Sequence, residues 1–412
     1  MRTGLLLLVL LVCGSAWGQR ILLMGDDTTY LDQSGWVSFY GNGDIGSSAL
    51  TNQFMEKLAL GGFIGDPTKQ EVESHLQEQN RLGGGLEWGV QYRSFGDTLF
   101  GLSDWGLDMA LENHIHGAAL FADNTYDLLF NGNAAHIGEQ LELDRNAAQL
   151  VRYQKLGFGL FHREHFSGVR LSVVNGQFFQ EALVDEAYLY TSAWADTLTL
   201  TYQGSYTQSD PAHTGLGSGN GIGLALDAVF NVPFEDGGGY FSVALNNLGH
   251  VWWSEATETY SADTSFTWTG VNFNDVSELN NIGLPNFSDT LHYTTETGRR
   301  QTWLPASVRA SVMRSLSDQA FWEAAITVRP DGIHLPLVEV GYGYMPNNST
   351  LWRFTGRAGG YGMPGLGLAL EKRMGATYLE VGVPDMPALV LNTLHGVGAY
   401  LRIGWFLKPQ QP

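Results

Sequence analysis

The sequence predicts an all-β protein: a closed antiparallel transmembrane β-barrel with short N-terminal helices in the periplasm or the lumen. Three observations predict this fold: segments of alternating apolar and polar residues, an N-terminal export signal, and a composition poor in charge. Only 16% of the 412 residues are charged, whereas 12% are aromatic and 52 are glycines. Typical soluble proteins carry about 25% charged residues. Strands that face lipid need apolar side chains, so this composition favours a barrel.

The first residues have the layout of a secretory signal peptide. Arg2 precedes an apolar run from Leu5 to Val12, and small residues follow at Ala16 and Gly18. We expect cleavage after Gly18. Residues 1–18 are then the signal peptide, residues 19–82 hold the first strand and the short helices, and residues 83–412 form the main barrel. The expected location is the outer membrane of a Gram-negative bacterium.

Period-2 alternation recurs along the chain and separates an apolar face from a polar face. In one segment Leu86, Trp88, Val90 and Tyr92 alternate with Glu87, Gly89, Gln91 and Arg93. Similar runs extend from Leu107 to His116, from Gly221 to Phe230 and from Gly396 to Leu407. We expect the apolar face to contact lipid and the polar face to line the lumen. The predicted lumen-facing polar residues are Glu87, Arg93, Asp108, Glu112, His114, His116, Asp227 and Arg402.

A soluble β-sandwich would also alternate, so other features decide between the two. Many segments are about 9–11 residues long, the length of a tilted transmembrane strand, and tryptophans lie near strand ends, as in the aromatic girdles of barrels. These are Trp88, Trp105, Trp194, Trp252, Trp253, Trp303, Trp322, Trp352 and Trp405. Hydrocarbon offers backbone amides no partner, so the sheet must close. About sixteen segments are strand candidates, and we predict fourteen strands, with twelve or sixteen as alternatives.

Two stretches near the N-terminus depart from the alternating pattern. Ala49 to Leu60 predicts a helix with Leu50, Phe54 and Leu58 on one face, and Pro67 to Gln79 predicts a second helix capped by Asp66. Polar helices cannot face lipid, so we place both in the periplasm or the lumen. Two long connections, Asp123 to Asn146 and Asn274 to Arg300, lack alternation and are expected to face outward.

Two longer motifs resemble a known group of proteins. The segment Leu128 to Leu143, LLFNGNAAHIGEQLEL, and the segment Leu245 to Phe273 resemble outer-membrane barrels of Bacteroidota that carry only a domain-of-unknown-function label. The resemblance extends from Trp36 to Leu407 and implies a barrel distantly similar to long-chain fatty-acid transporters and to barrel proteins of type nine secretion. It implies no particular ligand. The chain lacks the asparagine-proline-alanine stretch of the fatty-acid transporters, and a polar tail follows Phe406 and Leu407.

Few residues suggest chemistry. Glu112, His114 and His116 share one strand face and could approach a metal, but polar side chains are the default in a barrel lumen. His162-Arg163-Glu164-His165 fits neither zinc-hydrolase spacing and predicts a hairpin turn. The only cysteine, Cys13, lies in the signal peptide. We therefore expect no enzyme, no metal and no cofactor. The net charge of −20 argues against nucleic acid as a partner.

The leading functional hypothesis is transport or binding of a small hydrophobic or amphipathic ligand by a barrel embedded in outer-membrane lipid. The first alternative is a structural or assembly barrel that anchors an envelope protein partner without transport. A surface hydrolase is the second alternative.

Overall fold

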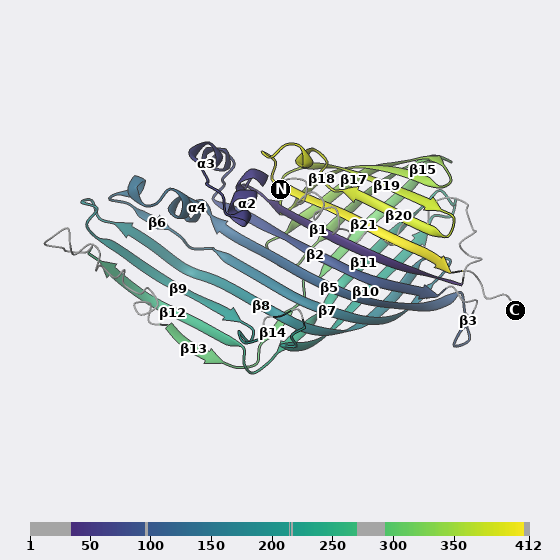
Figure 1. The fold of residues 1–412 in the computed structure, drawn as a ribbon, viewed down its shortest axis with the longest axis horizontal. Coiled ribbons are helices and arrows are strands. Elements are labelled where there is room, and N and C mark those ends of the chain that lie inside the picture. The colour runs from purple at the N-terminus through teal and green to yellow at the C-terminus, as the bar shows by residue number, and fades with distance from the viewer. Residues whose placement is uncertain (1–33, 95–97, 214, 216, 270–292, 408–412) are drawn as a thin grey trace.

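The computed structural model describes residues 34–94, 98–213, 215, 217–269 and 293–407. The predicted signal peptide, its cleavage site and the tail after Leu407 lie outside the described residues, as does most of the connection from Asn274 to Arg300. The sheet closes on itself through an unbroken ring of antiparallel pairs (Figure 1). The ring strands are β1 (Gly35–Ser47), β2 (Gln79–Ser94), β5 (Trp105–Ala122), β7 (Ala147–His162), β8 (Ser167–Thr191), β10 (Gly221–Pro233), β11 (Gly239–Trp253), β15 (Ser307–Ser317), β16 (Ala320–Val328), β17 (Leu335–Asn347), β18 (Thr350–Gly360), β19 (Gly365–Met374), β20 (Thr377–Val383) and β21 (Gly396–Leu407).

The prediction of a closed barrel with fourteen strands is confirmed. The sequence contains more strand candidates than the fourteen strands of the ring. The additional strands lie outside the ring, and several of them extend the sheet beyond it. β8 has 25 residues. Its first part pairs with β10 and its second part with β9 (Leu198–Gln208). Next come β12 (Glu258–Trp268) and β13 (Tyr293–Thr297). We call the second part of β8 with β9, β12 and β13 the wing; it projects beyond the ring (Figure 1).

The remaining strands are short. β14 (Gln301–Trp303) pairs with β11, and β6 (Gln140–Glu142) pairs with β8. β3 (Thr98–Leu99) and β4 (Leu102–Ser103) form a separate hairpin in the connection between β2 and β5.

The two ends of the barrel differ in their connections. One end, which we call the terminal end, holds Gly35 and Leu407, which pair with each other. Most of its turns are short, for example residues 318–319, 348–349 and 375–376, and its longest connection is residues 95–104. The opposite end, the loop end, holds long connections at residues 48–78, 123–146 and 384–395.

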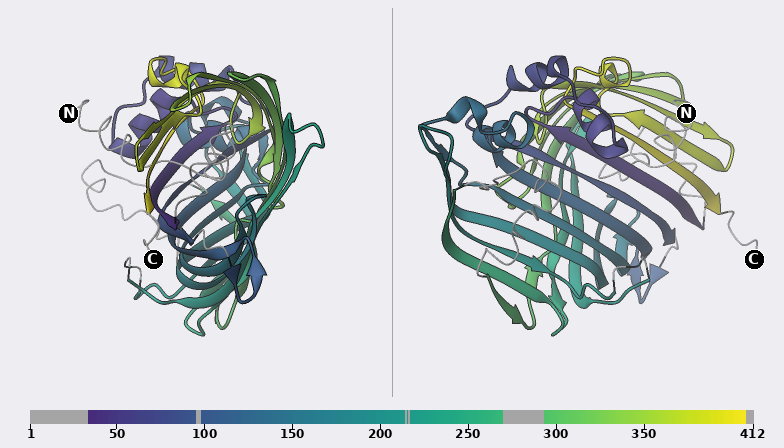
Figure 2. Two further views of the ribbon diagram at one scale, coloured as in Figure 1. Left: turned by 90° about the vertical axis from the view of Figure 1, so that its right-hand side faces the viewer. Right: turned by 60° about the vertical axis from the view of Figure 1, so that its left-hand side comes forward.

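The helices lie at the rim of the loop end (Figure 2). α2 (Asn52–Leu60) is capped by Thr51, and α3 (Asp66–Glu73) has Gly65 at its N-cap without a side-chain hydrogen bond. The prediction of Asp66 as the cap was therefore wrong. The second helix ends at Glu73, six residues before the predicted end at Gln79, which instead begins β2. Among the described residues no helix is long and apolar enough to cross a membrane.

An additional helix, α4 (Asp123–Phe130), lies in a segment that the sequence predicted as a loop. Phe54 of α2, Val72 of α3 and Tyr126 of α4 form one buried cluster, so the three helices pack together. α2 is also tied to the segment before β21, because the backbone N–H of Asn52 donates to the carbonyl of Leu394. The described part of the loop end also contains the one-turn 3-10 helices η3 (Ala134–His136) and η5 (Pro387–Leu389).

The side chains of the ring are arranged opposite to those of a soluble protein. Large apolar side chains on the outward face are exposed, including Val90, Leu111, Leu156, Val173, Leu224, Val308, Val340 and Phe354. Arg93, Lys155, Arg353 and Glu380, on the inward face, are at most 2% exposed. Of the predicted girdle tryptophans, Trp194, Trp252, Trp303, Trp352 and Trp405 are exposed. The expectation for Trp253 was wrong, because its indole turns inward and donates to Thr302.

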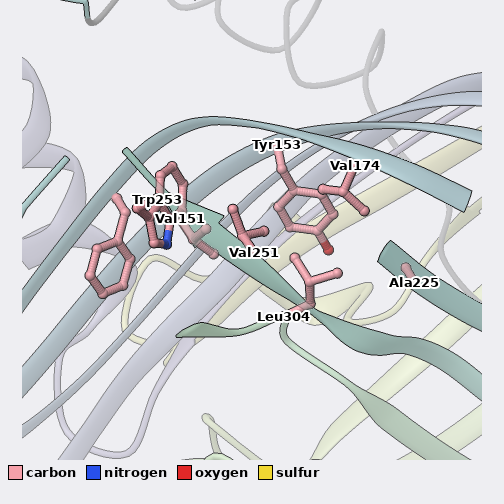
Figure 3. Close-up of a cluster of buried hydrophobic side chains, with 8 residues drawn as sticks. Val151, Tyr153, Val174, Ala225, Val251, Trp253 and Leu304 are labelled. Atoms are coloured by element: carbon pink, nitrogen blue, oxygen red, sulfur yellow. The ribbon is translucent and has the colours of Figure 1, made fainter. Parts of the chain in front are cut away.

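Apolar side chains pack together near the terminal end. One cluster contains Trp36, Phe161, Phe166, Tyr378 and Phe406, and a second contains Tyr240, Met313, Phe321 and Leu351. We call the two clusters together the floor. A further cluster, shown in Figure 3, lies on the inner wall near the base of the wing and includes Tyr153, Val174, Val251 and Trp253.

Candidate functional site

The middle of the lumen contains a cavity of about 210 Å³. Strands from opposite sides of the ring line it, because every second residue of each strand points inward. Thr355 of β18 shows why space remains: it pairs with Gly341 on one side and Gly367 on the other, and neither neighbour brings a side chain. A smaller cavity of about 50 Å³ adjoins the first toward the loop end and shares Asp44, His334, Leu337, Arg357 and Tyr361 with it.

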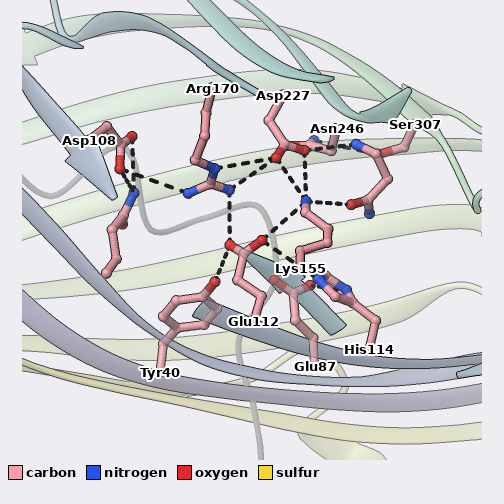
Figure 4. A network of polar contacts seen from close by, with 12 residues as sticks. Tyr40, Glu87, Asp108, Glu112, His114, Lys155, Arg170, Asp227, Asn246 and Ser307 are labelled. Carbon is pink, nitrogen blue, oxygen red and sulfur yellow. Dashed lines mark hydrogen bonds and ion pairs between the residues drawn. The ribbon is translucent and has the colours of Figure 1, made fainter. Parts of the chain in front are cut away.

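Between the cavity and the floor lies an ionic network, which we call the central network (Figure 4). The ammonium of Lys155 lies 3.1 Å from Glu112 Oε2 and 2.8 Å from Asp227 Oδ2. The guanidinium of Arg170 contacts the same two carboxylates at 2.9 and 3.1 Å. Tyr40 donates to Glu112, and Lys155 also donates to Asn247. Each charge therefore has several partners.

A further contact extends the network around the wall. Asp108 accepts from Arg93 and from Gln91, and it lies 3.8 Å from Arg170. The members come from β1, β2, β5, β7, β8, β10 and β11, which are consecutive neighbours in the sheet. The curvature of the sheet therefore brings their inward side chains together. Buried charges are tolerated when they are paired and hydrogen-bonded. The network thus fills much of this side of the lumen with fixed, mutually satisfied charge.

The other side of the lumen carries separate pairs. Arg309 of β15 bonds to Glu339 of β17, and Arg353 of β18 lies 2.6 Å from Glu371 of β19. Arg402 of β21 stacks its guanidinium over the rings of Trp36 and Tyr40, at 5.7 and 4.9 Å. Arg402 therefore links the charged region to the floor.

At the loop end, a hydrogen-bond chain crosses the lumen, and we call it the rim chain. The Tyr361 hydroxyl lies 3.1 Å from both His116 Nε2 and Asp331 Oδ2. Its single proton goes to the carboxylate, so His116 Nε2–H must donate to Tyr361, and His116 Nδ1 is free to accept from Arg329 at 3.3 Å. His116 belongs to β5, whereas Asp331 and Tyr361 belong to connections on the opposite wall. The chain therefore spans the mouth of the cavity.

His334 lies beside the rim chain, with its ring 4.8 Å from the ring of Tyr361. Burial, with a smaller effect of the nearby Arg329 guanidinium, lowers the pKa of His334 to about 4. This imidazole is therefore neutral near pH 7. Arg329 and Arg357 are the two half-buried guanidinium groups of this part of the cavity lining.

Comparison with known proteins assigns the chain to a family. A model of a family of unknown function, DUF5723, matches residues 42–379. The chain belongs to the DUF5723 family. No curated protein matches it.

Several solved structures resemble this DUF5723 barrel at low sequence identity. The toluene transporter TodX of Pseudomonas putida is 9% identical, with 95% of this chain and 98% of that chain covered and a TM-score of 0.39. The toluene transporter TbuX of Ralstonia pickettii is 8% identical, with 91% of this chain and 90% of that chain covered and a TM-score of 0.39. The translocator domain of the autotransporter NalP of Neisseria meningitidis is 10% identical, with 93% of this chain and 99% of that chain covered and a TM-score of 0.31.

The DUF5723 barrel holds all eight predicted lumen residues on its inward face. Glu87, Glu112, His114, His116 and Asp227 line the cavity. The other three lie nearer the floor: Arg93 and Asp108 belong to the central network, and Arg402 lies over the aromatic rings. His114 stacks on Tyr153 at 4.7 Å and lies 3.7 Å from Glu112 and 3.8 Å from Glu87.

The geometry does not gather these residues around a metal. Within the described part of the chain, no group of three or more His, Cys, Asp or Glu residues could hold a metal ion. His116 turns to the rim chain instead, and His114 stacks on a tyrosine. His162 and His165 stack on each other at the turn between β7 and β8.

Several site residues were missed in the sequence. Tyr40, Lys155 and Arg170 were not singled out, although Lys155 alternates with the apolar Leu156 and thus carries the signal of an inward position. Arg329, Asp331 and Tyr361 lie in short connections, where alternation gives no direction. Their role depends on folding of these connections over the mouth of the cavity.

Proposed function

We propose that the protein is an outer-membrane β-barrel that binds a small amphipathic ligand in its lumen and transports it. The observation that carries the membrane part is the exposure of apolar residues around the ring: Leu111, Val173 and Val340 are each more than half exposed. A contiguous apolar surface of this kind would drive a soluble protein to associate. In a membrane the same surface contacts lipid.

The connections support one orientation. Barrels of this class have short periplasmic turns and longer extracellular loops. The terminal end then faces the periplasm and the loop end faces outward, so the helices α2, α3 and α4 lie at the cell surface. This differs from the sequence prediction of periplasmic or luminal helices; no residue of α2 or α3 lines the described cavities.

The cavity supports an amphipathic ligand with a hydrogen-bond-accepting head. Arg329 and Arg357 are donors only, so they favour carboxylate, phosphate or carbonyl oxygens. Ala369, Val383 and Ala399 line another part of the same cavity and offer apolar contact. The ligand would enter from the loop end, after the rim chain opens.

A cavity-filling substitution tests this proposal. We expect Thr355→Trp to weaken ligand binding at least tenfold, because the indole would occupy the space beside Gly341 and Gly367. Phe354→Trp is the matched control, since Phe354 is the outward neighbour and is 51% exposed. Binding of decanoate, benzoate and toluene to the purified barrel in nanodiscs would be measured by native mass spectrometry, and uptake would be compared in cells with and without the protein. Absence of binding for all three compounds, or equal binding by Thr355→Trp, would contradict the proposal.

A second candidate function is an anchor for an envelope protein without transport. The floor favours it, because buried side chains such as Trp36 and Phe321 close the lumen near the terminal end. Crosslinking in intact cells separates the two functions. A single stoichiometric partner, together with normal function of the Thr355→Trp variant, would support the anchor.

A further inference from the structure

The outer wall has a hollow of about 850 Å³ just below the wing. It lies where β9 gives way to β10, and Gly215 and Ser218 of the connection between these strands lie on the outer face there. Two hydrogen bonds hold this connection against the wall: Arg152 donates to the carbonyl of Gly215 at 3.0 Å, and Asn175 donates to that of Ser218 at 3.2 Å.

The part of the hollow nearer the terminal end is apolar. Leu111, Leu156, Val173, Ile222 and Trp252 line it, and their exposed fractions are between 44% and 65%. They belong to the outward faces of β5, β7, β8, β10 and β11. The hollow is therefore continuous with the apolar surface that the proposed function places in lipid.

The part of the hollow nearer the loop end is polar. On the same outward faces, one step nearer the loop end, Gln154 donates to Asn113 at 2.8 Å and Asn175 donates to Gln154 at 3.4 Å. Asn175, Ser254 and Arg299 belong to the lining. Amides on a lipid-facing surface mark the level at which hydrocarbon ends. The hollow thus lies across the boundary between the acyl chains and the head groups.

Directly beyond this boundary, β8 continues into the wing, where its outward face is joined by those of β9, β12 and β13. Three tyrosines form a row there: the ring of Tyr206 is 6.1 Å from that of Tyr260, which is 5.6 Å from that of Tyr293. Hydrogen-bonding groups accompany them, because Tyr260 and Gln208 both donate to Glu258, and Gln180 donates to Tyr206. Aromatic faces beside amides and carboxylates suit sugars, whose C–H faces stack on rings and whose hydroxyls donate and accept.

We infer that this surface binds a glycolipid of the outer leaflet, with an acyl chain in the hollow and sugar residues on the tyrosine row of the wing. The inference rests on the membrane placement and orientation in the proposed function. It is independent of the luminal cavity. The choice of a glycolipid follows from the side chains met in turn along the wall toward the loop end. Apolar side chains come first, then amides, and then tyrosines beside a carboxylate.

Two substitutions test the two parts of the site separately. The probes are lipopolysaccharide with a short sugar chain and phosphatidylethanolamine, each titrated into the delipidated full-length protein and followed by native mass spectrometry. We expect one copy of lipopolysaccharide to bind at least tenfold more tightly than phosphatidylethanolamine. Ile222→Trp should weaken both lipids because it fills the hollow, whereas Tyr260→Ala should remove only the preference for lipopolysaccharide.

Matched controls lie on the same outward wall but away from the hollow. Phe230→Trp changes an exposed position farther along β10, and Tyr342→Ala removes an exposed tyrosine of β17. Both should bind lipid like the wild type. Equal affinity for the two lipids, or wild-type binding by Ile222→Trp, would overturn the inference. The Thr355→Trp variant distinguishes the two proposals, since it should lose the luminal ligand and keep the glycolipid.

Discussion

At the scale of single residues, Lys155 holds the central network together. It is 2% exposed, and its ammonium is shared between Glu112 and Asp227. Replacement by a neutral side chain of similar length leaves two buried carboxylates with Arg170 as the cation they still share. Breaking a buried pair in this way costs about 3–5 kcal/mol.

We therefore predict that Lys155→Met lowers the free energy of unfolding by about 3–5 kcal/mol. Urea unfolding of the barrel in lipid vesicles would measure the loss. Lys372→Met is the control, because Lys372 donates only to the hydroxyls of Ser349 and Thr350 near a turn, and its loss should be about 1 kcal/mol. Equal losses for the two variants would refute the assigned role of the network.

A second residue-scale prediction concerns the pair of His136 and Asp127 at the loop end, with 2.6 Å between Nε2 and Oδ2. The hydrogen bond to Asp127 raises the pKa of His136; hydrogen bonds from Asn131 and His136 lower that of Asp127, against the opposing effect of burial. The histidine contribution is complete below its unfolded pKa of about 6.5 and is lost as pH rises through the folded value. The aspartate contribution is present above its unfolded pKa of about 3.9 and is lost as pH falls through the folded value.

The connection between β5 and β7 should therefore be best protected between about pH 4 and pH 6.5. Hydrogen exchange of residues 123–146 would be measured from pH 5.5 to pH 8.5 and expressed as protection relative to the intrinsic exchange rate at each pH. This protection should be lower at the alkaline end. His136→Asn should remove this dependence, whereas His165→Asn, at the opposite end of the barrel, should leave it intact. Unchanged pH dependence in His136→Asn would exclude the pair as its source.

At the scale of elements, the alternation of each ring strand decides which substitutions the membrane tolerates. Val340 lies in the middle of β17, points outward and is 57% exposed. We predict that Val340→Arg destabilises the inserted barrel by about 2–4 kcal/mol, the cost of arginine near the bilayer midplane. Val390→Arg, at an exposed position of the loop end, is the control. Both variants would be compared by gel shift without boiling and by urea unfolding, and similar behaviour would place Val340 outside the lipid.

The strands could be predicted from the sequence because an apolar outward face and a polar lumen impose a period of two on the side chains. Interruptions were harder to predict. The break between β9 and β10 looks like a boundary between two full strands, although both occupy one line in the wall. α4 was missed because a helix of eight residues shows little periodicity, and its burial depends on packing of Tyr126 against Phe54.

The candidate site was predicted only in outline. The inward positions of Glu112 and Asp227 follow from local alternation, but their common partners Lys155 and Arg170 lie on other strands. The pairing of β5, β7, β8 and β10 brings these side chains together, and no pattern within a single strand encodes the register of that pairing. The rim chain is even harder to predict from the sequence, because Asp331 and Tyr361 lie in connections that show no alternation of apolar and polar residues.

At the scale of the whole molecule, the floor should prevent ion flow. We predict that the wild type gives no steady conductance in planar bilayers, because aromatic side chains and paired charges fill the terminal half of the lumen. The double variant Trp36→Ala and Phe406→Ala removes two stacked rings of the floor and should conduct. Phe158→Ala, at an outward position that is 53% exposed, should behave like the wild type. A large open conductance of the wild type would contradict a closed floor.

The length of β8 has a mechanical consequence. At about 3.3 Å per residue, its 25 residues extend over about 80 Å, far more than the roughly 30 Å of a hydrocarbon core. One hydrogen-bonded strand therefore runs from the terminal end of the barrel into the wing without an intervening hinge domain. A load applied to the wing would pass along this strand into the neighbouring pairs of the wall and would be borne by the barrel as a whole.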